Sequence, residues 1–305
     1  MEEKQNVKTK IEFVGTLRDS PFPKLTGEMA FLNDELEDPA PEICNCPQCQ
    51  DFDFIERKGS ALLVNDDVMV NIGGFPDTMY VTAAEIFINR YDDLRGIVFT
   101  SPRYMRGVLD MKKNLLTKPA HVIEHIPHDF NSMYNERLFA WFDAIHSYQY
   151  NQEFNLGGTS LEFISIFDSR FTRIAGLKID GHILYTPDFV TSHANMNQIF
   201  DGVDTWITDG RSLSMDVKDE HYPDGAEIEH MSMFNQLRLA GSHQVPAVVF
   251  THIGHIGKTL ERLDKDLTRF VGQHVPNVVS VEVVKNGDVY SNVEETIIEE
   301  GDVLE

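Results

Sequence analysis

The sequence predicts one α/β domain in which mixed β-sheets are covered on the outside by helices. Three observations support this fold class. The chain has 305 residues, 42% of them hydrophobic, which is ample for a buried core. Short apolar runs joined by turns occupy its first part, and strands alternate with helices further on. No linker-like composition interrupts residues 10–290, which favours a single domain.

The first half of the chain predicts mainly strands joined by turns. The tripeptide Asn65-Asp66-Asp67 is rich in turn formers and separates two apolar runs, which indicates a hairpin. Apolar residues at helical spacing indicate two helices, the second opened by an Asn-Ser capping signal. The expected strands are 11–15, 60–64, 68–72, 96–100 and 121–126, and the expected helices are 82–94 and 131–148.

The second half predicts alternating strands and helices. The turn Asp180-Gly181 separates two of the strands, and a pair of strands closes the domain within residues 278–291. The other expected strands are 160–167, 173–179, 182–185, 205–209 and 247–252, and the expected helices are 195–203, 228–242 and 256–271. Such alternation is typical of mixed sheets with helices on their outer faces.

Charge and hydropathy restrict the classes of partner. The formal net charge is −23, from 26 Lys and Arg and 49 Asp and Glu, so the surface repels a nucleic-acid backbone and favours solubility. No apolar run reaches the roughly 18 residues of a membrane helix, and the first residues contain no apolar signal region. We expect a soluble, cytoplasmic protein with an N-terminal tail at 1–10, one domain at 11–290 and an acidic tail at 291–305.

All three cysteines lie within six residues, in the motif Cys-x-Cys-x-x-Cys formed by Cys44, Cys46 and Cys49. An odd and tightly spaced set is not a disulfide framework. Three thiolates around one point suit Zn²⁺, whose tetrahedral structural sites need four ligands. Since the chain has no further cysteine, the fourth ligand must be a His or a carboxylate from elsewhere. The sequence therefore predicts a zinc loop at residues 40–52.

An ordered series of loop motifs extends through residues 11–288. It consists of FVGT, the Cys motif, NIGGFPD, FTSPRYMRG, ISIFDS, LYTPDF, EHMSMFNQ and VVFTHIGH. This series resembles the metallo-β-lactamase fold superfamily, in the branch that contains the phosphoribosyl cyclic-phosphate phosphodiesterase of phosphonate breakdown. The pyrroloquinoline-quinone biosynthesis B proteins are a related group with a similar Cys cluster. The resemblance implies an αββα sandwich of two mixed sheets flanked by helices.

The resemblance also implies ligands for a structural zinc. In this branch, the Cys cluster and the second His of a Thr-His-x-x-His motif hold that ion. Carried onto this sequence, the ligands are Cys44, Cys46, Cys49 and His255. The site would tie the N-terminal loop to the far end of the chain and stabilise it.

The family's catalytic site holds two metal ions, and this sequence departs from it. Asp188 matches the bridging Asp, His252 the first His of Thr-His-x-x-His, and Asp168 replaces a His. All four ligands of the His-x-His-x-Asp-His motif are gone, and the matching positions hold Ser101, Arg103, Met105 and Arg106. Asn71 and Ile72 stand where the family has an Asp. His230 matches a position near the substrate phosphate and is the candidate catalytic acid.

Arginine does not coordinate metal ions and carries a fixed positive charge. We expect Arg103 and Arg106 to pair with Asp168 and Asp188 in place of the two metal ions, unless both arginines point to solvent. Alternatively, Asp168, Asp188 and His252 hold one divalent ion such as Mn²⁺, Fe²⁺ or Zn²⁺. The set would be completed by a nearby histidine such as His121, His125, His128 or His193.

Three functions stay open on the sequence alone. The first is a non-catalytic protein with a structural zinc and a degenerate dinuclear site, which binds an anionic small molecule or a protein partner through Arg103, Arg106 and His230. The second is a metal-dependent phosphodiesterase with a rebuilt single-metal site. The third is an accessory protein of cofactor or peptide modification. Family members often form dimers, so the resemblance makes a homodimer an open expectation.

Overall fold

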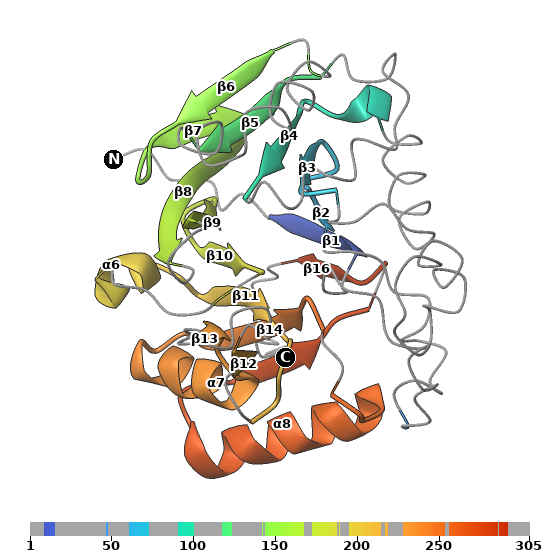
Figure 1. Cartoon of the computed structure of the whole chain (residues 1–305), viewed down its shortest axis with the longest axis vertical. Helices are drawn as coiled ribbons and strands as arrows, with labels where there is room; N and C mark the ends of the chain where they lie inside the picture. The colour runs from blue at the N-terminus through green and yellow to red at the C-terminus, as the bar shows by residue number, and fades with distance from the viewer. Residues whose placement is uncertain are drawn as a thin grey trace, which may run out of the picture.

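The computed structural model describes residues 9–15, 47, 61–72, 91–100, 118–123, 142, 144–167, 173–187, 189, 195–214, 217–218, 228–253, 256–285 and 287–291. Within these ranges the chain forms two seven-stranded sheets, a small hairpin and helices that lie against the second sheet (Figure 1). None of the helices found in these ranges is long and apolar enough to cross a membrane.

Sheet one contains the early strands and the last strand of the chain. Its order is β16-β1-β2-β3-β4-β5-β6, antiparallel from β16 to β3 and parallel from β3 to β6. The bounds are β1 Lys10–Gly15, β2 Ala61–Val64, β3 Val68–Val70, β4 Gly96–Phe99, β5 Ala120–Ile123, β6 Ile145–Tyr148 and β16 Val289–Ser291.

Sheet two repeats this succession of pairings. From β7 to β10 its strands are antiparallel, and from β10 through β11 and β14 to β15 they are parallel. The bounds are β7 Glu153–Leu156, β8 Thr159–Phe167, β9 Arg173–Ile179, β10 Ile183–Thr186, β11 Thr205–Asp209, β14 Ala247–Thr251 and β15 Ser280–Val283. The molecule therefore consists of two topologically similar halves.

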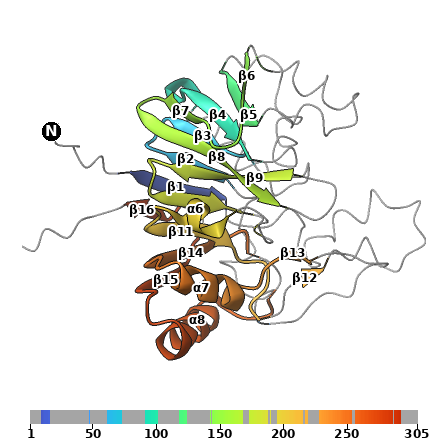
Figure 2. The same cartoon turned by 90° about the vertical axis from the view of Figure 1, so that its left-hand side faces the viewer.

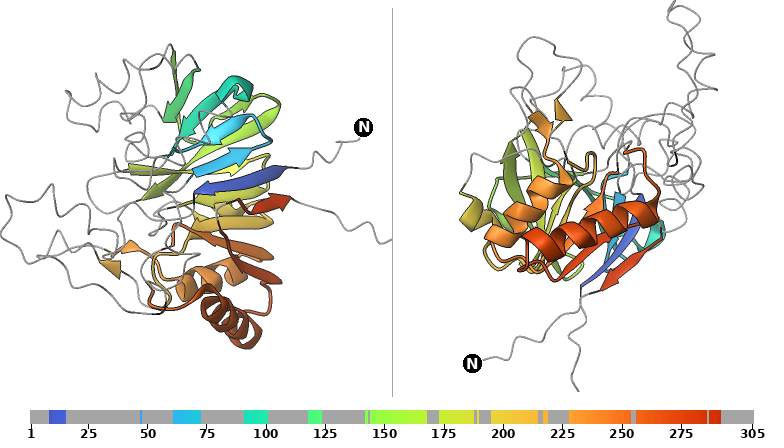
Figure 3. Two further views of the ribbon diagram at one scale, coloured as in Figure 1. Left: turned by 90° about the vertical axis from the view of Figure 1, so that its right-hand side faces the viewer. Right: turned by 90° about the horizontal axis from the view of Figure 1, so that it is seen from below.

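Two hydrophobic clusters hold the layers together. The first joins residues of both sheets, among them Phe13, Phe99 and Phe163, so it lies between the sheets. The second packs the other face of sheet two against helices through residues such as Trp206 and Leu263. Figures 2 and 3 show α7 and α8 beside β11, β14 and β15. The helices are α6 Met196–Phe200, α7 Met233–Ser242, α8 Leu260–His274 and the 3₁₀ turn η3 Tyr91–Asp93, and the small hairpin is β12 Val217–Lys218 with β13 Ile228–His230.

The αββα architecture is confirmed, as are most of the expected strands. The hairpin around Asn65-Asp66-Asp67 forms as expected, because Asn65 and Asp66 take the positive φ values of 49° and 65° that such a turn needs. Strand β5 occupies the first part of the range expected for it. The tails at 1–10 and 291–305 and the single-domain division stay predictions.

Four expectations were wrong in part, because tertiary pairing and capping override local spacing. Residues 145–148 belong to strand β6, not to a helix, since they pair in parallel with β5. Residues 228–230 form β13, and α7 begins only after the Ser232 cap. Helix α8 likewise begins after Thr259 rather than at residue 256. The closing strands do not pair together: β15 joins sheet two and β16 joins sheet one.

Candidate functional site

The parallel strands β10, β11 and β14 end side by side in the middle of sheet two. Their register pairs Thr186 with Thr208 and Asp209 with Thr251, so the residues that follow these strands emerge at one edge. In α/β folds, ligands bind outside the carboxyl ends of parallel strands. In the described structure, functional side chains are therefore expected at this edge.

A buried carboxylate and a buried imidazole meet at this edge. Asp209 ends β11 and His252 follows β14, and the distance from Asp209 Oδ1 to His252 Nδ1 is 3.5 Å, with side chains 0% and 3% exposed. The backbone of His252 has φ of +54°, a left-handed conformation that is uncommon outside glycine and is often found at functional sites. A carboxylate that hydrogen-bonds to Nδ1 would favour the tautomer that leaves Nε2 as a lone-pair donor, and the Asp209 carboxylate lies near that position at an ion-pair distance.

The loop after β11 packs closely against the end of β14. The amide of Gly210 donates to Thr251 O at 2.7 Å, and the amide of Arg211 donates to Asp209 Oδ1 at 2.7 Å. A Cβ at position 210 would lie 2.8 Å from Thr251 O and 2.3 Å from Ile253 Cδ1. Only glycine fits this contact, and the contact keeps Asp209 beside His252.

The segment around His230 is hydrogen-bonded to the segment around Asp188. The amide of Met231 donates to Phe189 O at 2.9 Å, and the carbonyl of Met231 accepts from Gln236 Nε2 at 2.7 Å. Met231 directly follows His230 in the sequence, and Phe189 directly follows Asp188. The hydrogen bond between Met231 and Phe189 therefore joins the residue after His230 to the residue after Asp188.

A buried polar network lies beneath this edge. Trp206 Nε1 donates to Thr186 Oγ1 at 2.8 Å, and the hydroxyls of Thr186 and Thr208 are 3.0 Å apart. Thr208 Oγ1 donates to Gln236 Oε1 at 2.5 Å, and Gln236 Nε2 also donates to Asp209 O at 2.7 Å. All of these side chains are fully buried. The network joins β10, β11 and α7 directly below the Asp209–His252 pair.

Among the described residues, an uncharged cluster lies at the corresponding edge of sheet one. Asn71 follows β3 with φ of +61°, and its Nδ2 donates to Thr100 Oγ1 at 2.9 Å and to Tyr185 OH at 3.4 Å. Its Oδ1 accepts from the amide of Thr100 at 3.0 Å. Because Tyr185 belongs to β10, this cluster links the two sheets next to the strand ends. Both polar atoms of the Asn71 side chain are used within the protein.

Of the predicted site residues, the structure places His252 at this edge and His230 at the end of β13. The predicted site residues Cys44, Cys46, Cys49, Arg103, Arg106, Asp168, Asp188 and His255 lie outside the described residues, so the structure does not test the predicted zinc site. Among the described residues, no three His, Cys, Asp or Glu side chains gather as ligands of one metal ion. His121 does not join His252: it lies in β5, with Nδ1 2.9 Å from Tyr148 OH and its ring stacked on His146.

Sequence reasoning missed two residues of this edge, Asp209 and Gln236. A carboxylate followed by glycine at the end of an apolar strand was a visible signal for Asp209. Gln236 had no such signal, because a glutamine in an amphipathic helix is ordinarily exposed.

Comparison with known proteins identifies the fold. The sequence matches no protein-family model and no curated protein. Among solved structures, a diphosphatase from the PhnP family is 14% identical with a TM-score of 0.64, covering 94% of this chain and 98% of that chain. Protein YhfI from Bacillus subtilis is 15% identical with a TM-score of 0.60, covering 94% and 100%. Zn²⁺-bound PqqB from Methylobacterium extorquens is 14% identical with a TM-score of 0.60, covering 92% and 99%.

Proposed function

We propose, starting from the metallo-β-lactamase fold of this chain, that the protein is stabilised by a structural zinc. We also propose that it binds a phosphate-type anion at the place where the sequence resemblance implies a centre of two metal ions. The observation that carries the proposal is the difference between the two strand-end edges. The edge of sheet two has the buried Asp209–His252 pair, whereas the edge of sheet one has the neutral Asn71 cluster.

Asn71 argues against a second metal ion. An amide oxygen is a poorer ligand than a carboxylate for a transition metal, and this one already accepts from the Thr100 amide. The sequence directly after Thr100 supplies Arg103 and Arg106 at two positions where the resemblance implies His ligands. Two guanidinium groups would supply positive charge without metal ions and would bind phosphate oxygens in a bidentate manner.

The structural zinc is supported by the chemistry of its donors. Three cysteines and one histidine, Cys44, Cys46, Cys49 and His255, form a complete tetrahedral set for Zn²⁺. His255 lies two residues beyond Ile253, which is fully buried at the end of β14. A zinc at these residues would fix the 40–52 loop beside the edge that carries His252, and would hold it there without taking part in chemistry.

Metal analysis and anion titration test the proposal together. We expect one zinc per chain after dialysis, lost in Cys46→Ser, and binding of inorganic diphosphate by calorimetry without added divalent metal. Arg103→Ala should weaken diphosphate binding about tenfold or more, since one charge-assisted contact contributes roughly 1.5–3 kcal/mol. Absence of zinc, or diphosphate binding that Arg103→Ala leaves unchanged, would contradict the proposal.

A single-metal hydrolase is the second candidate, and the Asp209–His252 pair favours it. A histidine oriented by a carboxylate is a frequent metal ligand, and Asp168 and Asp188 would complete the set. At that site, a bound divalent ion would activate water or polarise a phosphoryl oxygen. Turnover of bis-p-nitrophenyl phosphate that requires Mn²⁺ or Zn²⁺ and disappears in Asp188→Asn would select this candidate over the first.

A further inference from the structure

We propose that Gln236 is a positioning residue, which holds the loop after β11 and the segment after His230 at a fixed separation and so shapes the anion site. This inference rests on the proposed function. The side chain of Gln236 is fully buried, and its amide group contacts three residues in two parts of the chain, Thr208 and Asp209 of β11 and Met231. Its Nε2 donates to Asp209 O and to Met231 O, both at 2.7 Å.

The groups at the two ends of this network determine which group donates and which accepts in every hydrogen bond between them. At one end, Trp206 Nε1 is a donor only, and at the other, the carbonyls of Asp209 and Met231 are acceptors only. The Thr186 hydroxyl therefore accepts from Trp206 and donates to Thr208 Oγ1, and Thr208 donates to Gln236 Oε1. The Gln236 amide then has one orientation, with both of its N–H groups directed at the two carbonyls. Hydrogen bonds arranged in one direction strengthen each other in a buried environment.

The two carbonyls belong to the segments that the site requires. Asp209 faces His252, and the Met231 amide donates to Phe189 O, which directly follows Asp188. One glutamine side chain thus connects the Asp209–His252 pair with the segments that carry His230 and Asp188. An apolar side chain of similar size would fill the same space but would leave two buried carbonyls and the Thr208 hydroxyl without this partner.

Calorimetric titration with inorganic diphosphate tests the proposal on the full-length protein. We expect Gln236→Met and Thr208→Val each to weaken binding about tenfold, because buried polar groups lose their partners and the segments shift. Asn235→Met is the matched control: this neighbouring side chain lies outside the network and accepts from Arg238 at 2.7 Å. Equal affinity in Gln236→Met and in the control would overturn the proposal.

A second variant, Gln236→Glu, keeps the size of the side chain and adds a pH-dependent readout. An ionised carboxylate would face two carbonyl oxygens in a buried site, whereas the protonated acid still donates one hydrogen bond. We expect its diphosphate affinity, relative to the wild type at each pH, to fall as the pH rises from 5 to 8. A profile parallel to the wild type would contradict the role of Gln236.

Histidine ring NMR separates this inference from the proposed function. The ring ¹H–¹⁵N signals of His230 and His252 should move in Gln236→Met and remain in place in Asn235→Met. If the wild type does not bind diphosphate, the proposed function fails, while these signals still decide whether Gln236 positions the segment. Unchanged ring signals in Gln236→Met would refute the positioning role even in a protein that binds diphosphate.

Discussion

Two residues that directly follow strands have a left-handed backbone conformation, which strand pairing does not require. Asn71 and His252 both follow buried strands and both have positive φ, of 61° and 54°. Non-glycine residues adopt this region at an energetic cost that surrounding contacts must offset. For Asn71 the contacts are its hydrogen bonds to Thr100 and Tyr185, and for His252 they include the approach to Asp209. Two of the described non-glycine residues with positive φ therefore lie directly after strands of the two sheets, one in each sheet.

Gly210 provides a prediction at this scale. Gly210→Ala would push a methyl group against Thr251 O and Ile253 Cδ1, and a backbone oxygen cannot rotate away. We expect a loss of about 1–3 kcal/mol in the free energy of unfolding, as in other overpacked sites, and weaker diphosphate binding. Urea denaturation measures the first effect. Gly272→Ala in α8 is the control, since a Cβ there meets nothing within 4 Å, and it should raise stability by about 0.5–1 kcal/mol.

His121 provides a pH-dependent prediction. Burial, with a contribution from the nearby His146, lowers the pKa of His121 from 6.5 to about 4. As the pH falls below about 6.5, His121 becomes protonated in the unfolded chain. In the folded protein the same residue becomes protonated only near pH 4, so acid favours the unfolded state. The free energy of unfolding should therefore decrease across this window, by up to about 3 kcal/mol. Urea denaturation from pH 7 to pH 4 measures the decrease.

The comparison variant is His121→Gln, whose stability should depend less on pH over the same interval. His274→Gln, at the exposed end of α8, should keep the wild-type dependence. An identical pH dependence in wild type and His121→Gln would show that other groups cause the loss of stability.

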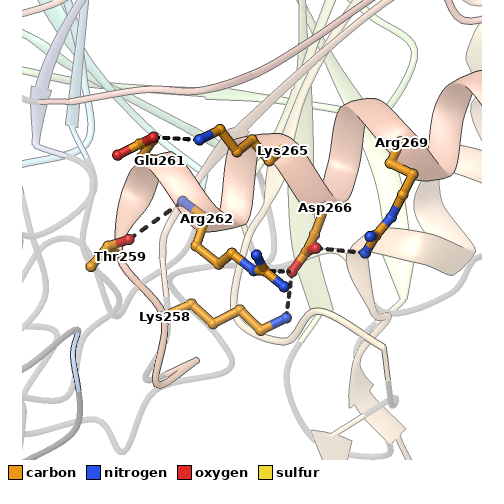
Figure 4. A network of polar contacts seen from close by, with 7 residues as sticks. All are labelled: Lys258, Thr259, Glu261, Arg262, Lys265, Asp266 and Arg269. Atoms are coloured by element: carbon orange, nitrogen blue, oxygen red, sulfur yellow. Dashed lines mark hydrogen bonds and ion pairs between the residues drawn. The ribbon is translucent and has the colours of Figure 1, made fainter.

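Among the elements, α8 is held by a charge cluster that the sequence pattern alone does not reveal. Lys258 Nζ and Arg269 Nη2 lie 2.6 Å and 2.7 Å from the carboxylate of Asp266, and Arg262 Nε lies 3.8 Å from it (Figure 4). The hydrogen bond from Lys258 is the main cause that lowers the pKa of Asp266. Since Lys258 precedes the Thr259 cap, this ion pair joins the residue before the cap to the second turn of α8.

Asp266→Asn tests this element. Removing the carboxylate should lower the free energy of unfolding by about 1 kcal/mol at pH 7, allowing for solvent screening of its partners. Because the pKa of Asp266 is lowered in the folded state, the stabilisation is present above about pH 4 and is lost as the pH falls further. Thermal denaturation at pH 7 and pH 3 measures the difference. Glu261→Gln removes the exposed partner of Lys265 on the same helix and should change stability less than Asp266→Asn does, because solvent screens this exposed pair.

The sequence predicted where strands and turns occur far better than it predicted which strands pair with each other. The turn residues Asn65-Asp66-Asp67 fixed a hairpin, because turn chemistry is local. The pattern of residues 278–291 indicated two strands but carried no information that they belong to different sheets. Similarly, helical spacing extended into residues 145–148, where pairing with β5 decides the conformation. Of the site, His252 followed from a motif, whereas the burial of Gln236 arises only from packing between α7 and sheet two.

At the scale of the whole molecule, two similar halves carry different chemistry at equivalent edges. Sheet one and sheet two share the same succession of strand pairings, yet one edge is neutral at Asn71 and the other has a carboxylate beside an imidazole. A centre of two metal ions needs ligands from both halves. The proposed loss of the metal ions would follow mainly from the four replaced ligands after β4 of sheet one, since sheet two keeps Asp188 and His252 and has one replacement, Asp168 for a His.

Anomalous X-ray scattering from crystals grown with excess zinc and manganese tests this proposal most directly. We predict one strong zinc peak, at the Cys44, Cys46, Cys49 and His255 ligands, and no pair of metal peaks near His252 and Asp209. Two fully occupied metal positions beside His252 would contradict the proposal and would identify the protein as a metal-dependent hydrolase.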